Sequence, residues 1–247
     1  MPRTARHKSE SGIYHVMLRG IDKRNIFLKP NDYEKFIESI IKAKEKVKFF
    51  VYAYCLMTNH VHILVKQDNE DIGDTVRRIA VSYAQYHNNK YGRTGHLFQN
   101  RFRSEAVDND QYFLTVIRYI HQNPLKAGII KNIGDYKWSS YNEYINNNEC
   151  IVDSEFVLSY FKSIKEFINY HNEINEDVCL DYNQKKRWAD EELKEFILTY
   201  PNISYLQKLD KKTRDTIIKN IKEDTGASNR QLARVLKIGR GILDTIK

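Results

Sequence analysis

Two histidines close together in the sequence are the first residues that point to chemistry. His60 and His62 are separated by Val61, in a stretch where apolar and polar residues alternate. Such alternation is typical of a half-buried strand, on which residues two apart point to the same face, about 7 Å from each other. The two imidazoles can then converge on one metal ion while Val61 faces the core. Because a lone His-x-His pair is common by chance, a metal site needs a third ligand.

A helix later in the chain offers that ligand. Its polar residues recur every three or four positions beside an apolar stripe, so they share one side of the helix; they are Tyr112, Thr115, Tyr119 and Asn123. An amide oxygen from Asn123 and two imidazoles make an open site of mixed nitrogen and oxygen ligands. Such a site suits Mg²⁺ or Mn²⁺ carrying water and a phosphate oxygen better than a closed structural zinc.

The same helix offers a nucleophile. Tyr119 lies one turn from Asn123, where its phenol can attack a phosphodiester that the metal polarises. A free phenol has a pKa of about 10, so a cation or a base must favour the phenolate. A covalent phosphotyrosine would preserve the bond energy for rejoining. The competing interpretation is that Tyr119, one of 17 tyrosines, simply packs in the core.

The elements that must position these residues follow the order strand, helix, strand, strand, helix, an irregular segment with a strand, and helix. We expect them at residues 15–18, 31–47, 49–57, 60–66, 72–91, 95–107 and 108–123. Thr58 and Asn59 should form the turn between the two central strands. Helices alternating with hairpin strands favour an α+β architecture, in which an antiparallel sheet carries helices on its faces.

Local signals set the expected ends of these helices. Asn31 with Glu34 three residues later predicts the N-terminal cap of the first helix. Gly92 predicts the end of the second. Pro124 lacks an amide hydrogen and restricts Asn123, so the third helix should kink or end there.

The pattern loosens after Tyr144 into residues 146–148, three asparagines. We therefore expect a catalytic domain at residues 1–148, a linker or mixed segment at 149–189 and a helical domain at 190–247. In the last of these, Ser228 caps a helix at 230–236, residues 237–239 form a tight turn, and Ile242, Leu243 and Ile246 belong to a final short helix. This layout is typical of a helix-turn-helix. A small helical bundle that only packs or dimerises fits the same pattern.

The charge balance points to a polyanionic partner. Among 247 residues, 40 Lys and Arg oppose 32 Asp and Glu, which gives a formal net charge of +8. Basic residues beside aromatic ones combine phosphate neutralisation with base stacking, as in single-strand binders. The expected DNA contacts are Arg101, Arg103, Phe98, Phe102, Arg77, Arg78, Arg93 and Lys126, with Arg240 and Lys247 in the C-terminal domain. The competing interpretation is solvated surface charge for the arginines and core packing for the phenylalanines.

Cysteine spacing and apolar runs exclude other classes. Cys55, Cys150 and Cys179 are far apart and form no Cys-x-x-Cys pair, so we expect neither a disulfide framework nor a thiolate zinc knuckle. The longest apolar run, at 49–57, is far shorter than the roughly 20 residues of a membrane-spanning helix. The basic first residues contain no apolar signal segment. We expect a cytoplasmic protein without a membrane partner, associated with the nucleoid when it binds DNA.

Four motifs together resemble the HUH single-tyrosine transposases, and among them the REP-associated tyrosine transposases. They are His60-Val61-His62, the segment from Gly95 to Phe102, the segment from Tyr119 to Pro124, and Trp138-Ser139-Ser140-Tyr141, within about residues 10–145. The resemblance implies a ferredoxin-like antiparallel sheet and a divalent metal, Mg²⁺ or Mn²⁺. It also implies cleavage of single-stranded, hairpin-containing DNA, which leaves a 5′-phosphotyrosine and a free 3′-hydroxyl.

Carried over by motif, His60 and His62 become metal ligands, Tyr119 the nucleophile and Asn123 the third ligand. Two other functions remain in view. A histidine-triad nucleotide hydrolase or transferase also has alternating histidines, but here Leu64 occupies the third position. A non-catalytic DNA-binding regulator derived from a transposase would keep the basic surface without cutting. Both a monomer and a homodimer fit the sequence.

Overall fold

The computed structural model describes residues 8–146, 151–175, 177, 179–180, 188–201 and 203–246. The chain divides into two compact units, residues 1–181 and 182–247. The first unit contains both predicted catalytic motifs.

The first unit is built on an antiparallel sheet. Its strands are β1 (Ile13–Arg19), β2 (Phe49–Met57), β3 (His60–Gln67) and β4 (Arg103–Ala106), arranged in the order β2-β3-β1-β4. With the helices between them, this is the predicted α+β, ferredoxin-like arrangement. The strand expected within 95–107 is shorter than that segment, but residues 97–99 still follow the end of β1, where Gly20 and Phe98 form an isolated bridge.

The register of β3 fixes the direction of its side chains. Val61, Ile63 and Val65 are at most 2% exposed and belong to the core, as the alternation predicted. His60 lies opposite Arg19, and His62 lies opposite Met17. A two-residue turn at 58–59 joins β2 to β3, also as predicted.

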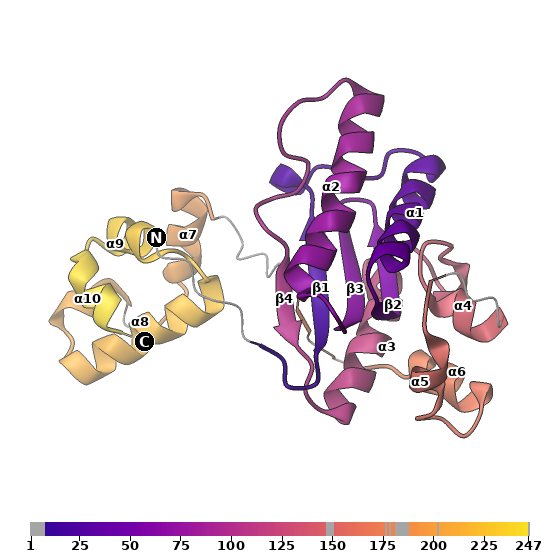
Figure 1. Cartoon of the computed structure of the whole chain (residues 1–247). Coiled ribbons are helices and arrows are strands. Elements are labelled where there is room, and N and C mark those ends of the chain that lie inside the picture. The colour runs from indigo at the N-terminus through magenta and orange to yellow at the C-terminus, as the bar shows by residue number, and fades with distance from the viewer. Residues whose placement is uncertain are drawn as a thin grey trace. The chain divides into compact units, whose positions relative to one another are not determined.

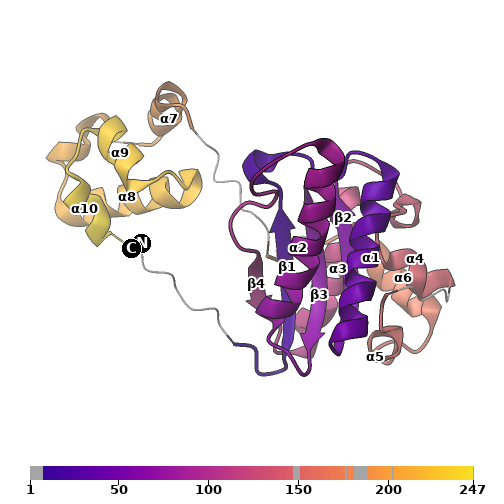
Figure 2. The same ribbon diagram turned by 45° about the horizontal axis from the view of Figure 1, so that its top comes forward.

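Two helices cover one face of the sheet and one covers the other. Helices α1 (Pro30–Lys46) and α2 (Ile72–Tyr91) pack side by side on one face, and α3 (Asp110–Lys126) packs on the opposite face against β2 and β3 (Figures 1 and 2). Gly92 ends α2 in the left-handed conformation, at φ 59°. The hydrophobic core therefore lies in two layers, and the layer under α3 holds the histidine face of β3.

Two of the predicted helix ends are wrong. At α1 the capping carboxylate is Asp32, whose Oδ2 accepts from the backbone N–H groups of Leu28 and Lys29, so the helix begins earlier than the Asn31 signal indicated. Helix α3 continues through Pro124 to Lys126. Pro124 has no N–H to donate to Ile120 O, but the helix continues for two more residues, and Ala127 N still donates to Asn123 O at 2.9 Å.

The first unit extends beyond the boundary predicted at residue 148. Short helices α4 (Tyr141–Asn146), α5 (Ser154–Leu158) and α6 (Ile164–Asn172) follow α3 in the chain, and α6 packs against both α3 and α4. Val157 and Phe167 are fully buried in the main core. The polar run at 146–148 suggested a linker, but the apolar residues after it complete the core beside α3.

The second unit is all helical in the residues that the structure describes. Helices α7 (Asp190–Ile197), α8 (Lys211–Thr225), α9 (Asn229–Leu236) and α10 (Arg240–Thr245) surround a separate core that includes Leu193, Ile218, Ile221, Leu232 and Leu243. Short 3₁₀ segments lie at Ile21–Lys23 and Ile133–Asp135 in the first unit and at Ile203–Lys208 in the second. No helix among the described residues is long and apolar enough to cross a membrane.

The predicted turn between the last two helices is present. Ser228 accepts from Gln231 N at 3.2 Å, and Lys237 ends α9 in the left-handed conformation at φ 54°. Helix α10 then begins after Gly239. The local pattern of a helix, a tight turn and a short helix is therefore as expected, and its role in DNA binding stays a prediction.

Candidate active site

The histidine pair lies on the sheet face covered by α3. The ring centroids of His60 and His62 are 5.1 Å apart, with the planes near perpendicular. His60 is half-buried, and its Nδ1 lies 2.6 Å from Asn59 Oδ1. His62 is fully buried. Strand β3 thus brings the two imidazoles together as the spacing predicted.

A third histidine, His15, joins this pair. It lies on β1, and its Nε2 is 2.9 Å from His62 Nδ1. His15 was not predicted because its place depends on the pairing of β1 with β3, which puts it opposite Leu64 and diagonal to His62. A histidine within a predicted strand, on the same alternation as Arg19, was the only signal available.

The protonation of His62 can be worked out from its partners. Burial, with the nearby His15 and His60, holds the pKa of His62 well below its ordinary value. Burial also lowers the pKa of His15 to about 3. Both rings are therefore neutral. His62 Nε2 is buried without a hydrogen-bond partner in the described part of the chain.

A divalent cation suits the unpartnered His62 Nε2, because a metal-binding imidazole must be neutral and must direct a lone pair at the ion. If Nε2 holds the lone pair, the proton is on Nδ1 and is donated to His15 Nε2. Metal-binding histidines commonly donate their second ring N–H to an acceptor of this kind, which orients the ring. The donors present therefore fit a bound cation.

Helix α3 places Tyr119 against these rings. The Tyr119 ring centroid lies 5.8 Å from that of His62 and 6.1 Å from that of His15, both in edge-on contacts. Tyr119 is 7% exposed. The fold thus brings the predicted nucleophile next to the predicted ligand pair, which lies 57 to 59 residues earlier in the chain.

Lys126, predicted to extend a DNA-binding surface, lies beside Tyr119. Its Nζ is 5.4 Å from the centre of the Tyr119 ring. The same ammonium donates to Asn175 Oδ1 and to Asp177 O. A cation at this position favours the ionised form of a neighbouring phenol.

Asn123 is one turn beyond Tyr119 on the same helix. Its Nδ2 donates to the backbone oxygen of Tyr119 at 3.4 Å, which leaves the amide oxygen to act as a ligand. The described residues contain no group of three or more His, Cys, Asp or Glu side chains suited to a metal. Asn123, whose amide oxygen can bind a cation, remains the predicted third ligand.

His121 and Gln122, which lie between Tyr119 and Asn123 in the sequence, make contacts that stabilise the fold. His121 Nδ1 lies 2.9 Å from His171 Nε2, and His121 Nε2 lies 2.7 Å from Ser140 Oγ. Gln122 donates to the backbone oxygen of His171 at 2.7 Å. His121 and Gln122 therefore join α3 to α6 and to the Trp138–Tyr141 motif, while Tyr119 faces the histidine pair.

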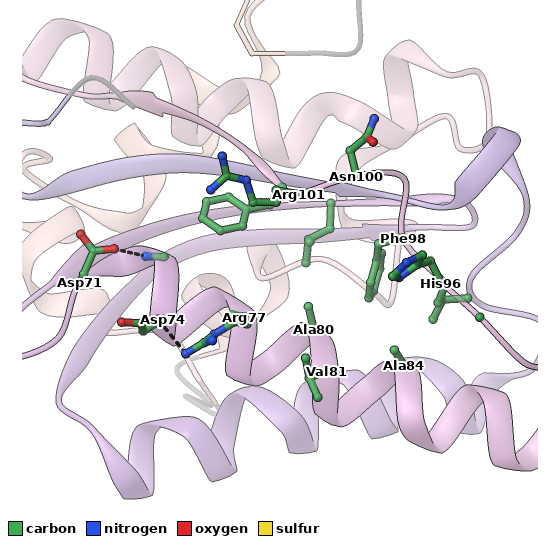
Figure 3. A pocket seen from close by; sticks show the side chains of 15 residues that line it. Asp71, Asp74, Arg77, Ala80, Val81, Ala84, His96, Phe98, Asn100 and Arg101 are labelled. Carbon is green, nitrogen blue, oxygen red and sulfur yellow. Dashed lines mark hydrogen bonds and ion pairs between the residues drawn. The ribbon is translucent and has the colours of Figure 1, made fainter. Parts of the chain in front are cut away.

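Four of the predicted DNA contacts line one cavity of about 550 Å³ between α2 and residues 95–102 (Figure 3). They are Arg77, Phe98, Arg101 and Phe102. Both phenylalanines are half-buried and pack against the main core, and their contact with DNA stays a prediction. Arg101 is exposed.

The remaining predicted DNA contacts do not share that cavity. Arg78 pairs with Glu70 at 2.6 Å, and Arg240 with Asp244 at 3.4 Å. Arg93 follows α2, and Arg103 is exposed on β4. Lys247 lies outside the described residues.

The similarity to known proteins is concentrated in the first unit. Residues 8–123 match a family model described as Transposase IS200 like. This segment contains the histidine pair, Tyr119 and Asn123, so the predicted resemblance to the single-tyrosine transposases is confirmed. In sequence, this part of the first unit is similar to the IS200-like transposases.

Individual relatives are more specific. A REP-associated tyrosine transposase of Escherichia coli strain K12 is 24% identical over 136 residues, covering 54% of this chain and 78% of the relative. A Haemophilus influenzae relative named for the same group is 24% identical over 154 residues, covering 57% and 86%. A solved structure of a REP-associated tyrosine transposase bound to a REP hairpin has a TM-score of 0.52 and 22% identity, covering 59% of this chain and 86% of that one. That likeness confirms the predicted fold.

Proposed function

We propose that this protein cuts and rejoins single-stranded, hairpin-containing DNA through a 5′-phosphotyrosine at Tyr119, with a divalent metal at the histidine pair. The observation that carries the proposal is the edge-on contact of Tyr119 with a neutral, buried His62 whose Nε2 has no protein partner among the described residues.

Each residue has a defined part in this reaction. The Tyr119 oxygen forms a bond to phosphorus while the bond from phosphorus to the 3′ oxygen breaks. The phenol loses its proton, which Lys126 assists by favouring the phenolate, and the departing 3′ oxygen gains one. In rejoining, a 3′-hydroxyl attacks the phosphotyrosine and releases Tyr119.

His60, His62 and Asn123 would hold the metal. When bound, a Mg²⁺ or Mn²⁺ ion polarises the phosphodiester and stabilises the charge that develops on it. His15 sets the orientation and proton position of His62. The burial of His62 keeps it unprotonated, and therefore able to bind a cation, throughout the neutral range.

Hairpin DNA is the proposed substrate for two reasons. A REP-associated tyrosine transposase of the same fold has been solved with a REP hairpin. In addition, the chain has a formal net charge of +8, which favours a polyanion. Arg101 and Arg77 with Phe98 and Phe102 supply cations and aromatic rings on one surface.

The test uses labelled single-stranded DNA with an imperfect hairpin from the DNA flanking the gene. The protein is incubated with it in Mn²⁺ or in EDTA, and covalent adducts are resolved on denaturing gels. We expect a protease-sensitive adduct in Mn²⁺ alone, lost in Tyr119→Phe and kept in Tyr112→Phe, a matched change on the same helix. Retention of DNA on native gels without any adduct would instead support the non-catalytic regulator.

A further inference from the structure

The cavity between α2 and residues 95–102 is preformed. Gly95 and Asn100 both have positive φ, 85° and 56°, so the chain turns near each end of this segment. Its middle is fixed to the end of β1, because Ile21 N donates to Leu97 O and Gln99 N donates to Arg19 O. The cavity volume of about 550 Å³ lies within the range of roughly 300–1,000 Å³ found for ligand pockets.

The walls of this cavity are flat, apolar and partly aromatic. Helix α2 contributes the small side chains of Ala80, Val81 and Ala84, which face Phe98 across the opening (Figure 3). Val81 is 49% exposed, so part of this apolar wall is open to solvent. A planar ring can enter between these two walls and stack on Phe98.

The charged residues lie around the opening. Arg101 forms no ion pair with any described residue and is exposed. Arg77 pairs with Asp74 at 2.9 Å, and Asp71 Oδ1 accepts from Gly73 N at 2.7 Å, so both carboxylates already have partners. An apolar slot with an exposed guanidinium at its opening fits a planar ring attached to an anion.

The cavity lies at the edge of the sheet that leads to the proposed reaction site. His60 is paired with Arg19 in the sheet, and Gly20 N donates to Asn59 O. Gly20 in turn forms a bridge with Phe98, so the backbone passes from the histidine strand to the cavity wall across two strand spacings, about 10 Å in the plane of the sheet. The histidines lie on the face covered by α3 and the cavity on the face covered by α2, so a DNA strand that reaches both must pass around this edge over several nucleotides.

From these observations we propose that the cavity binds one unpaired nucleobase of the DNA flanking the cleaved phosphate. The base stacks on Phe98 opposite Ala80 and Ala84, and Arg101 contacts its phosphate. This proposal rests on the proposed function, since it assigns part of the single-stranded DNA to a defined pocket. A general basic surface would bind all nucleotide positions similarly, whereas this cavity should make the affinity depend on the base at one position.

The test is a series of fluorescein-labelled hairpin oligonucleotides in which each unpaired flanking nucleotide in turn is abasic. Their affinities for the full chain are measured by fluorescence anisotropy in EDTA, which separates binding from cleavage. The variant Ala84→Phe fills the cavity without changing charge. Asn89→Phe adds the same ring on an exposed part of α2 outside the cavity lining and serves as the matched control.

We expect one abasic position to weaken binding to the native protein about tenfold or more, because base stacking on an aromatic side chain contributes that much. Ala84→Phe should weaken binding of the intact DNA by a similar factor. For this variant, removal of the base at that position should cause no further loss of affinity. Asn89→Phe should bind as the native chain does. Thermal melting of each variant shows that it is folded.

Two results would overturn the proposal in different ways. If every oligonucleotide of the series binds with the same affinity to the native protein and to Ala84→Phe, no base occupies this cavity, while the proposed function stands. The same conclusion follows if the loss of affinity from the abasic position and the loss from Ala84→Phe multiply. If the native protein fails to bind any hairpin oligonucleotide, both proposals fail together.

Discussion

In the proposed site, where His62 directs Nε2 at a cation, His15 accepts the proton on His62 Nδ1. Its Nε2 lies 2.9 Å from His62 Nδ1, so His15→Ala removes the acceptor that holds the ring in place. Loss of such a partner typically costs about 10- to 100-fold in metal affinity. We predict a loss of this size for Mn²⁺ binding measured by titration calorimetry. His15→Gln, which keeps an acceptor oxygen, should recover part of the affinity.

The control for this change is His96→Ala, since His96 is exposed on the segment beside α2. It should bind Mn²⁺ as the native protein does. Equal Mn²⁺ affinity in His15→Ala and the native protein would remove His15 from the site.

Substitution of Lys126 tests how Tyr119 is activated as a nucleophile. Its ammonium lies 5.4 Å from the Tyr119 ring centre, and a cation at this range favours the phenolate. We predict that Lys126→Met slows adduct formation about tenfold near neutral pH and less at alkaline pH, the effect of one lost neighbouring charge. Rates at several pH values measure this, and Lys126→Arg should restore most of the rate. Parallel pH profiles for Lys126→Met and the native protein would contradict it.

At the scale of the elements, α6 supports α3 from behind through a buried histidine. Burial, with Arg118 nearby, lowers the pKa of His171 to about 3 although Phe167 O accepts its Nδ1 proton. His121 faces it from α3. The unfolded chain therefore binds the proton more tightly, so the stabilisation is complete above a pH of about 6.5 and is lost as the pH falls towards 3.

This linkage gives a measurable result. Between pH 7 and pH 5 the free energy of unfolding should fall by about 2 kcal/mol more in the native protein than in His171→Gln, which has no group to titrate there. Urea unfolding at both pH values measures the difference. Equal losses in the two proteins would show that His171 is not the buried group responsible.

The sequence alone predicted the elements that depend on local pattern. The alternation around His62 and the helical stripe through Tyr119 both depend on spacing within one segment, and both are present. His15 was missed because its contact depends on strand register between distant segments. Phe167 was placed in a linker because short helices lack a clear period, and only packing on α3 reveals its burial.

At the scale of the whole molecule, each of the two units has its own hydrophobic core, so a change in one can be tested for its effect on DNA binding and on adduct formation separately. The second unit has its own core, and its short helix α10 carries the exposed Arg240, which among the described residues pairs with Asp244, four positions further on. If this unit binds DNA phosphates, Arg240→Gln should reduce the slope of log affinity against log salt by about one.

Adduct formation with saturating DNA should be unchanged in the same variant, because Tyr119 lies in the first unit. Arg234→Gln is the control, since Arg234 already pairs with Asp190 at 2.5 Å. An unchanged salt slope in Arg240→Gln would indicate that Arg240 contacts no phosphate.

The measurement that tests the central claim most directly is identification of the residue bonded to DNA. The full chain is allowed to react with hairpin DNA in Mn²⁺, digested with nuclease and protease, and analysed by tandem mass spectrometry. We predict a nucleotide 5′-phosphate attached to the peptide that contains Tyr119. Attachment to any other residue, or an adduct-free digest from DNA that has been cut, would contradict the assignment of Tyr119 as the nucleophile.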